Sequence, residues 1–232
     1  MQDNQTGPSE TGVPQGERPV AGFGLLVGAY AAIIRSEAGT EYYGQARALD
    51  ALPAQKVRRL SELERGVIAC VIDLPETLAD APYVLASRYG AMPHTLKILK
   101  DLAAGEALSP TAFALSVHNA VLGAASQLAG NKGGHTALSA GEDSLMAGFI
   151  ECAARLSTGD EEVVLIVSDL RLQEEYAAFE TVDADVQLAC TLRRRNTPAV
   201  APQADLPVPG PEAASQFLRL LASDTKELKW PI

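Results

Sequence analysis

The feature that most constrains the fold of this sequence is the run EVVLIV at residues 162–167, which is apolar after its first residue. A strand with one face in water alternates apolar and polar residues, whereas a strand covered on both faces is continuously rich in Val, Ile and Leu. We therefore expect an α/β fold in which helices cover both faces of a sheet. The pattern of residues 109–161 agrees, because it predicts a helix, a Gly-rich turn, a short strand, an abrupt turn at residues 139–143 and a second apolar helix.

Hydrophobic periodicity predicts the other elements of the fold. We expect strands at residues 21–34, 83–88 and 184–192, helices at residues 55–74, 92–104 and 212–222, and a polar connection at residues 36–54. The apolar run at residues 21–34 is also compatible with a helix. In the helix at residues 92–104, the spacing of Leu96, Leu99 and Leu102 predicts that these side chains face the core.

Composition divides the chain into three parts. Residues 1–20 are rich in Gln, Gly, Pro, Ser and Glu and bury too little apolar surface to offset the entropy of ordering, so we expect a disordered tail. We expect residues 21–195 to form the folded domain. Residues 196–232 predict a Pro-rich linker and a C-terminal docking helix. The N-terminal residues show neither a signal peptide nor an apolar run long enough to span a membrane.

Charge and cysteine usage exclude several classes of function. The formal net charge of −10 argues against a nucleic-acid partner, because phosphate binding needs clustered Lys and Arg. The three cysteines, Cys70, Cys152 and Cys190, are far apart and show no CxxC spacing, so we expect neither disulfides nor a zinc site. No other metal ligand set or cofactor motif stands out, and a reducing, cytoplasmic location is the simplest expectation.

The abrupt turn at residues 139–143 is notable for the residue types that it lacks. Ala140, Gly141, Glu142 and Asp143 lie where a strand is followed by a helix, and neither Ser nor Cys occupies the two middle positions. A helix N-terminus at such a turn is a place where a nucleophile or an anion could sit. The two carboxylates favour the helix dipole but disfavour a thiolate or an anionic substrate nearby.

Three segments carry a resemblance to a known family: SPTAFALSVHNAVLGAASQLAG, then GHTALSAGEDSLMAGFIECA, then GDEEVVLIVSD. In this order they resemble the N-terminal half of the β-ketoacyl synthases, the condensing enzymes of fatty-acid and polyketide synthesis. Asn119 and Ala120 match an Asn-Ala pair of the family, and Ala140 matches the Ala before its nucleophilic cysteine. The resemblance covers residues 56–169 and is strongest to short ketosynthase-like proteins encoded among aryl polyene and type II polyketide genes. It implies half of a thiolase fold, a layered α-β-α arrangement with a mixed sheet and buried helices.

The same resemblance implies that this chain is catalytically incomplete. Gly141 falls at the position of the family's nucleophilic cysteine, and glycine cannot accept an acyl chain. The family's two catalytic histidines lie in its C-terminal half, whereas this sequence has no histidine after Cys190. We therefore expect no catalytic residue and no independent activity as a β-ketoacyl-ACP synthase.

The role implied by the resemblance is that of an accessory subunit. Such a subunit forms a heterodimer with an active ketosynthase, as a chain-length factor does, and acyl carrier protein serves the active partner. Family members dimerise through the strand before the nucleophile, so the implied interface consists of His118, Asn119, His135, Thr136, Ala137, Leu138, Ser139 and Ala140. An edge strand of this kind needs covering by a partner.

Two alternatives remain open from the sequence. The first is an acyltransferase or hydrolase that uses Ser139, Ser144 or Cys152 as a nucleophile, with His118 or His135 as the base. The second is a homodimer that acts as a scaffold or binds acyl chains. The pathway, whether fatty-acid, polyketide or aryl polyene synthesis, and the acyl chain length do not follow from the sequence.

Overall fold

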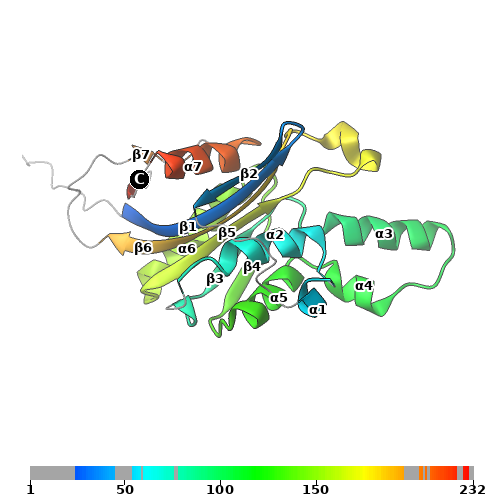
Figure 1. The fold of residues 1–232 in the computed structure, drawn as a ribbon, viewed down its shortest axis with the longest axis horizontal. Coiled ribbons are helices and arrows are strands. Elements are labelled where there is room, and N and C mark those ends of the chain that lie inside the picture. The colour runs from blue at the N-terminus through cyan, green and yellow to red at the C-terminus, as the bar shows by residue number, and fades with distance from the viewer. Residues whose placement is uncertain are drawn as a thin grey trace, which may run out of the picture.

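The computed structural model describes residues 24–44, 54–58, 60–75, 78–195, 204–205, 207, 210–223 and 227–229, which form one sheet flanked by helices (Figure 1). In chain order the elements are β1 (Gly24–Ser36), β2 (Gly39–Gly44), α1 (Ala54–Val57), α2 (Glu62–Val71), β3 (Tyr83–Ala86), α3 (Met92–Ala103), α4 (Pro110–Leu115), α5 (Ala120–Ala129), β4 (His135–Leu138), α6 (Ser144–Thr158), β5 (Glu162–Asp169), the 3₁₀ helix η3 (Glu174–Phe179), β6 (Asp185–Arg195), β7 (Ala204–Asp205), α7 (Ala213–Ala222) and β8 (Glu227–Lys229). The expected tail at residues 1–20 and most of the expected linker after residue 195 lie outside the described residues.

The sheet is mixed, as expected. Its strand order is β4-β3-β5-β6-β1-β8-β7, with β2 paired to β1 beside this path. Strand β3 pairs in parallel with both β4 and β5, while β5–β6, β6–β1 and β1–β2 are antiparallel. Strand β4 therefore lies at one edge, and in the described part of the chain it pairs with β3 alone.

Strand β5 is buried on both faces, which confirms the prediction from its apolar run. Val163, Leu165 and Val167 belong to a core cluster with residues of α6 and α7 on one face. Val164 and Ile166 belong to a second cluster with residues of α2 and α5 on the other face. The alternation of side chains along a strand thus builds two cores, and the fold has a helical layer on each side of the sheet.

Three expected boundaries were wrong. The helix expected before the Gly-rich turn is two helices, α4 and α5. Residues 36–54 include strand β2, which forms a hairpin with β1 through Gly39 at φ 131°. The expected helix at residues 55–74 is two helices, α1 and α2, because Ser61 starts a new helix. Its hydroxyl accepts the Glu64 N–H at 3.3 Å, and the Glu64 carboxylate accepts the Ser61 N–H at 2.7 Å. This capping box satisfies the first N–H groups of α2, and its S-x-x-E spacing is visible in the sequence.

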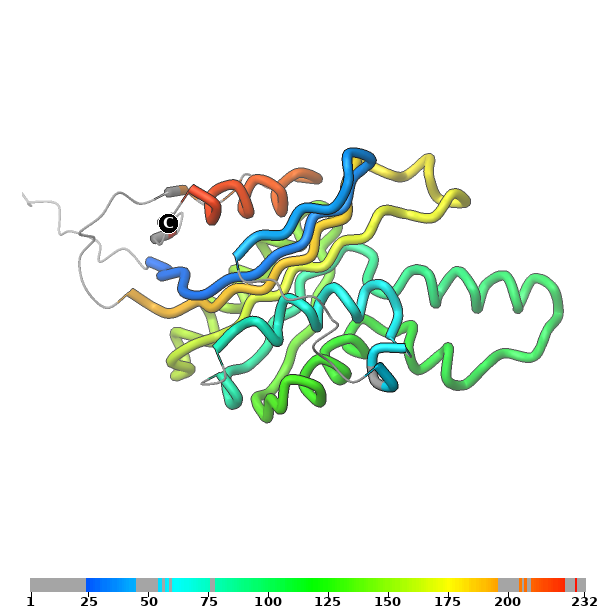
Figure 2. The backbone as a smooth tube through the Cα atoms, viewed as in Figure 1, coloured from blue at the N-terminus to red at the C-terminus, as the bar shows by residue number. Residues whose placement is uncertain are grey.

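The expected orientation of α3 was only partly right. Leu96 is buried, but Leu99 and Leu102 are exposed. The reason is tertiary, because α3 runs away from the sheet and returns as α4, so that the two helices project as an arm from the body (Figure 2). The outer part of α3 therefore has no sheet beneath it to cover its leucines.

The C-terminal helix α7 docks on the sheet of this same chain. Phe217 of α7 meets Phe149 of α6 edge to face, with ring centroids 5.0 Å apart and planes at 81°, and both rings are fully buried. Offset and edge-to-face pairs of this kind add to the hydrophobic gain from burial. The division of the chain at residue 195 remains a prediction, but the described part of α7 shares a core with residues 24–195.

Replacing Phe217 tests whether α7 belongs to the folding unit. We expect Phe217→Ala to lower the free energy of unfolding by about 3 kcal/mol or more, because it removes a buried ring and leaves a cavity. Denaturant unfolding measures this loss. As the control, Phe179→Ala removes a ring that is 67% exposed and should cost less than about 0.5 kcal/mol. Equal stability of the two variants would mean that α7 is not part of the cooperative core.

Candidate functional site

The candidate site is the turn between β4 and α6. Gly141 lies at its centre with φ 60°, in the left-handed region that glycine adopts without strain. The Ser144 hydroxyl donates to the Gly141 carbonyl at 2.6 Å and accepts the Ala140 N–H at 3.0 Å. Asp143 closes the turn with a backbone hydrogen bond to the Ala140 carbonyl at 3.1 Å. These bonds hold residue 141 exposed at the start of α6.

A side chain at position 141 would point into open space. A Cβ built on Gly141 has no neighbouring atom within 4 Å among the described residues. Ala140, Glu142 and Asp143 are exposed as well. The turn therefore presents position 141 to whatever approaches this edge of the molecule, and glycine supplies no reactive atom there.

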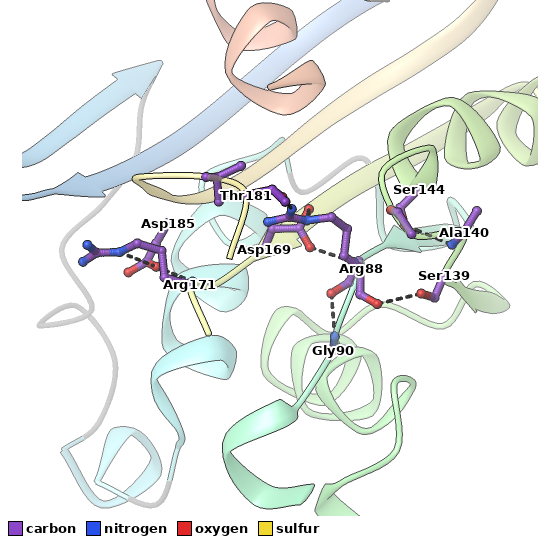
Figure 3. A network of polar contacts seen from close by, with 12 residues as sticks. Arg88, Gly90, Ser139, Ala140, Ser144, Asp169, Arg171, Thr181 and Asp185 are labelled. Carbon is purple, nitrogen blue, oxygen red and sulfur yellow. Dashed lines mark hydrogen bonds and ion pairs between the residues drawn. The ribbon is translucent and has the colours of Figure 1, made fainter. Parts of the chain in front are cut away.

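A polar network fixes the turn to the ends of two neighbouring strands (Figure 3). Ser139 donates its hydroxyl to the Arg88 carbonyl at 2.7 Å, which ties the end of β4 to the end of β3. The Arg88 N–H donates to Asp169 Oδ1 at 2.7 Å, which ties β3 to β5. Because β3, β4 and β5 are parallel, their carboxyl ends meet at one edge of the sheet and these groups come within bonding distance.

Arg88 and Asp169 also form a buried ion pair. Arg88 Nε lies 3.4 Å from Asp169 Oδ2, and Arg88 Nη1 donates to Thr181 Oγ1 at 2.9 Å. Burial raises the pKa of the Asp169 carboxyl, although the N–H and guanidinium of Arg88 act in the opposite direction. The free-energy cost of removing both charges from water offsets much of their attraction. The pair therefore fixes the positions of the two side chains more than it stabilises the fold. It connects the turn to residues 170–184, the segment between β5 and β6.

Sequence patterns did not identify Arg88 and Asp169 as site residues. The available signal was positional, since each is a charged residue that follows a short apolar strand, after YVLAS and VVLIVS respectively. Which strands were neighbours, and hence that the two side chains would meet, depended on the sheet order.

The two candidate histidines lie in different surroundings. His118 lies between α4 and α5 and packs on Gly90, where an added Cβ would be 2.7 Å from the imidazole ring. The atom Nε2 of His118 is buried and has no hydrogen-bond partner in the described part of the chain. His135 begins β4 and is exposed. Neither imidazole is hydrogen-bonded to Ser139 or Ser144.

The three candidate nucleophiles are all occupied or buried. The hydroxyls of Ser139 and Ser144 each donate to a backbone carbonyl, as described above. Cys152 is fully buried in the middle of α6, and burial raises the pKa of its thiol well above the usual range. Burial likewise raises the pKa of Cys70 to about 12 and raises that of Cys190. None of these three candidate nucleophiles is therefore activated by a bonded histidine base.

The residues expected at an interface lie along one edge of the molecule. His135 is exposed, whereas Thr136, Ala137 and Leu138 are half-buried. Beside the strand, Arg155 of α6 donates to Thr136 Oγ1 at 2.6 Å and to Glu151 Oε1 at 2.8 Å, which holds α6 against β4. The remaining predicted residues, Asn119 and those of the turn, are exposed.

Two further features were sought in the described residues, a cluster of metal ligands and a helix that could span a membrane. Within the described ranges, no three His, Cys, Asp or Glu side chains are grouped so that they could hold a metal ion. In the same part of the chain, every helix is too short or too polar to cross a membrane.

Comparison with known proteins agrees with the fold. The model of the β-ketoacyl synthase N-terminal domain matches residues 34–223. The sequence has no significant match among curated proteins. A solved structure of the ketosynthase ApeO in complex with its chain length factor ApeC from Xenorhabdus doucetiae contains a chain similar to this one, with 24% identity and a TM-score of 0.63, over 73% of this chain and 78% of that one.

Two other similar structures are larger than this chain. A β-ketoacyl synthase from Burkholderia phymatum STM815 is 9% identical with a TM-score of 0.54, over 74% of this chain. The ishigamide ketosynthase/chain length factor is 12% identical with a TM-score of 0.51, over 75% of this chain. The match spans 59% of the chain length in each of these proteins. At these identities the likeness concerns the fold, and it confirms the expected thiolase-like, layered arrangement.

The exposure of position 141 can be tested with a thiol reagent. In the native protein at about pH 8, we expect Cys70, Cys152 and Cys190 to react slowly, because they are buried and their thiolates are disfavoured. Gly141→Cys should add one rapidly reacting thiol. The control Ala153→Cys places a thiol at a buried position and should add none. A Gly141→Cys protein as unreactive as this control would contradict the described turn.

Breaking the Arg88–Asp169 pair should destabilise the whole domain. We expect Asp169→Asn to lower the free energy of unfolding by about 3 kcal/mol, because it leaves the buried guanidinium of Arg88 without a counter-charge. The control Asp101→Asn breaks the exposed ion pair with Lys97 and should leave the stability unchanged. Thermal or denaturant unfolding of both variants provides the comparison, and an equally stable Asp169→Asn protein would refute a structural role for the pair.

Proposed function

This chain belongs to the β-ketoacyl synthase family through its N-terminal domain, and we propose that it is a non-catalytic accessory subunit of an active ketosynthase, in the manner of a chain-length factor. The observation that carries the proposal is Gly141. It occupies the exposed, left-handed position between β4 and α6, which corresponds by resemblance to the family's nucleophilic cysteine. Glycine has no atom at this position that could accept an acyl group.

The chemistry of condensation supports this assignment. A decarboxylative condensation needs a thioester nucleophile and groups that stabilise the enolate. In the described residues Cys70, Cys152 and Cys190 are buried, and neither His118 nor His135 is hydrogen-bonded to a hydroxyl or thiol. A partner that carries out the reaction supplies both groups, and acyl carrier protein delivers substrate to that partner.

The open edge of β4 supports a protein partner. The carbonyls of Gly134 and Leu138 accept the N–H groups of Tyr83 in β3 and of Ser87 directly after it, at 2.9 and 3.2 Å. Since groups on a strand alternate in direction, the N–H of Ala137 points to the other side, away from β3. Unpaired edge groups of this kind pair readily with another chain. The similar proteins described in solved structures include a ketosynthase in complex with its chain length factor, which favours a heterodimer.

The pathway and location are part of the same proposal. Resemblance to the short ketosynthase-like proteins favours aryl polyene or related polyketide synthesis, with fatty-acid synthesis as the broader class. Its place is the cytoplasm, which agrees with three unpaired, buried cysteines.

Co-purification with acylation tests the proposal directly. The tagged chain is co-expressed with the ketosynthase encoded beside it, and the purified material is incubated with an acyl thioester. We expect a one-to-one complex in which intact mass shows acylation of the partner only. If this chain purifies alone and gains the acyl mass itself, the accessory role is refuted and Ser139, Ser144 and Cys152 become the residues to replace.

A proline in the edge strand tests the β4 interface. We expect Ala137→Pro to weaken the complex by about tenfold or more, because it removes the outward N–H and places a ring at the contact. The fold should persist, since the N–H of Ala137 does not bond to β3. The control Ala137→Val keeps the N–H and should bind like the wild type. Binding is measured by titration against the purified ketosynthase, and unchanged affinity of the proline variant would exclude β4 from the interface.

A further inference from the structure

The helical arm, which comprises residues 92–117 with α3, α4 and the loop between them, exposes an unusual amount of apolar surface. Phe113 is 65% exposed and Leu102 is 61% exposed. The other exposed apolar side chains of the arm are Leu99, Leu108 and Val117. The arm projects beyond the body of the molecule (Figure 1), so no other described element covers these side chains. Apolar surface gathered in this way marks an interaction site.

The α4 half of the arm and the segment that follows it are also free of charged side chains. Residues 107–131 contain no Asp, Glu, Lys or Arg, in a chain of which 21% is charged. Much of this segment is exposed, including α4 and one side of α5. A solvated helix pair normally carries charges on its outer face, whereas the centre of a protein–protein interface is depleted of charge and enriched in aromatic residues. The α4 half of the arm has the composition of an interface.

This uncharged surface continues to the β4 edge. His118, at the base of the arm, packs on Gly90, and Ser139, at the end of β4, bonds to the neighbouring Arg88. Helix α5 lies behind β4, because Ala137 packs on the cluster that contains Val121, Leu122 and Ala125. Residues 133–141 also lack charged side chains. The base of the arm and the end of β4 thus lie close together, through Gly90 and Arg88.

We infer that the helical arm is a second contact element for the ketosynthase that covers β4, and that Phe113 and Leu102 pack on an apolar, uncharged surface of that partner. The inference rests on the proposed function, since it assigns the same partner to a further surface. It goes beyond that function in placing part of the binding energy on the arm, outside the edge strand.

The charges near the arm favour a protein over a membrane. Helices that bind membrane surfaces carry Lys and Arg on their polar face. The lysines of α3 are instead neutralised, because Lys97 pairs with Asp101 at 2.7 Å and Lys100 pairs with Glu175 of η3. A second copy of this chain is also disfavoured, because self-association brings together two molecules with a net charge of −10 each.

A matched pair of variants tests the inference. Phe113→Ala removes a ring that is 65% exposed on the arm, and Tyr42→Ala removes a ring that is 62% exposed on β2, away from the β4 edge. Titration against the purified ketosynthase should show at least about tenfold weaker binding for Phe113→Ala and binding within about twofold of wild type for Tyr42→Ala. Both variants should unfold like the wild type, because both rings are exposed.

The possible results separate this inference from the proposed function. If wild type and Phe113→Ala bind the ketosynthase equally well, the arm has no role and the accessory function stands. If the wild type binds no ketosynthase, both are refuted. The inference is overturned if Phe113→Ala loses self-association, or loses binding to vesicles of anionic phospholipid, with no effect on ketosynthase binding. The arm would then bind a second copy of this chain or a membrane.

Discussion

The burial of β5 on both faces is the constraint on which the rest of the structure depends. Its side chains alternate between two cores, one with α6 and α7 and the other with α2 and α5. A strand so apolar is stable only when both faces are covered, because each exposed Val, Leu or Ile would cost about 1.5–3 kcal/mol. The three layers follow from that requirement, and so does the docking of α7 through Phe217 on α6.

The parallel pairing of β3 with β4 and β5 places three strand ends together, and the polar groups there hold the turn before α6. Arg88 is the central residue, since its carbonyl bonds to Ser139, its N–H to Asp169 and its guanidinium to Asp169 and Thr181. The turn is thus shaped by residues other than Gly141. The shape of the turn therefore does not depend on a side chain at position 141.

Association, rather than chemistry, is the property that the exposed surface of this chain favours. The edge of β4 offers backbone groups that pair with no described residue, and the helical arm offers exposed apolar side chains such as Phe113 and Leu102. Water solvates these side chains poorly, and a partner that buries them gains hydrophobic energy. Both surfaces support the proposed role of an accessory subunit that binds a partner protein.

The sequence by itself determined the local features: the doubly buried β5, the short β3 and β4, the abrupt turn around Gly141 between strand and helix, and the amphipathic α7. Even the break before α2 was encoded locally, in Ser61 and Glu64, although periodicity alone obscured it. Only the tertiary structure decided that β2 pairs with β1, that Leu99 and Leu102 are exposed, and that Arg88 meets Asp169. The physical reason is that periodicity reports which side chains are apolar, whereas burial and pairing depend on which distant segment lies opposite, and that follows from the order of strands in the sheet.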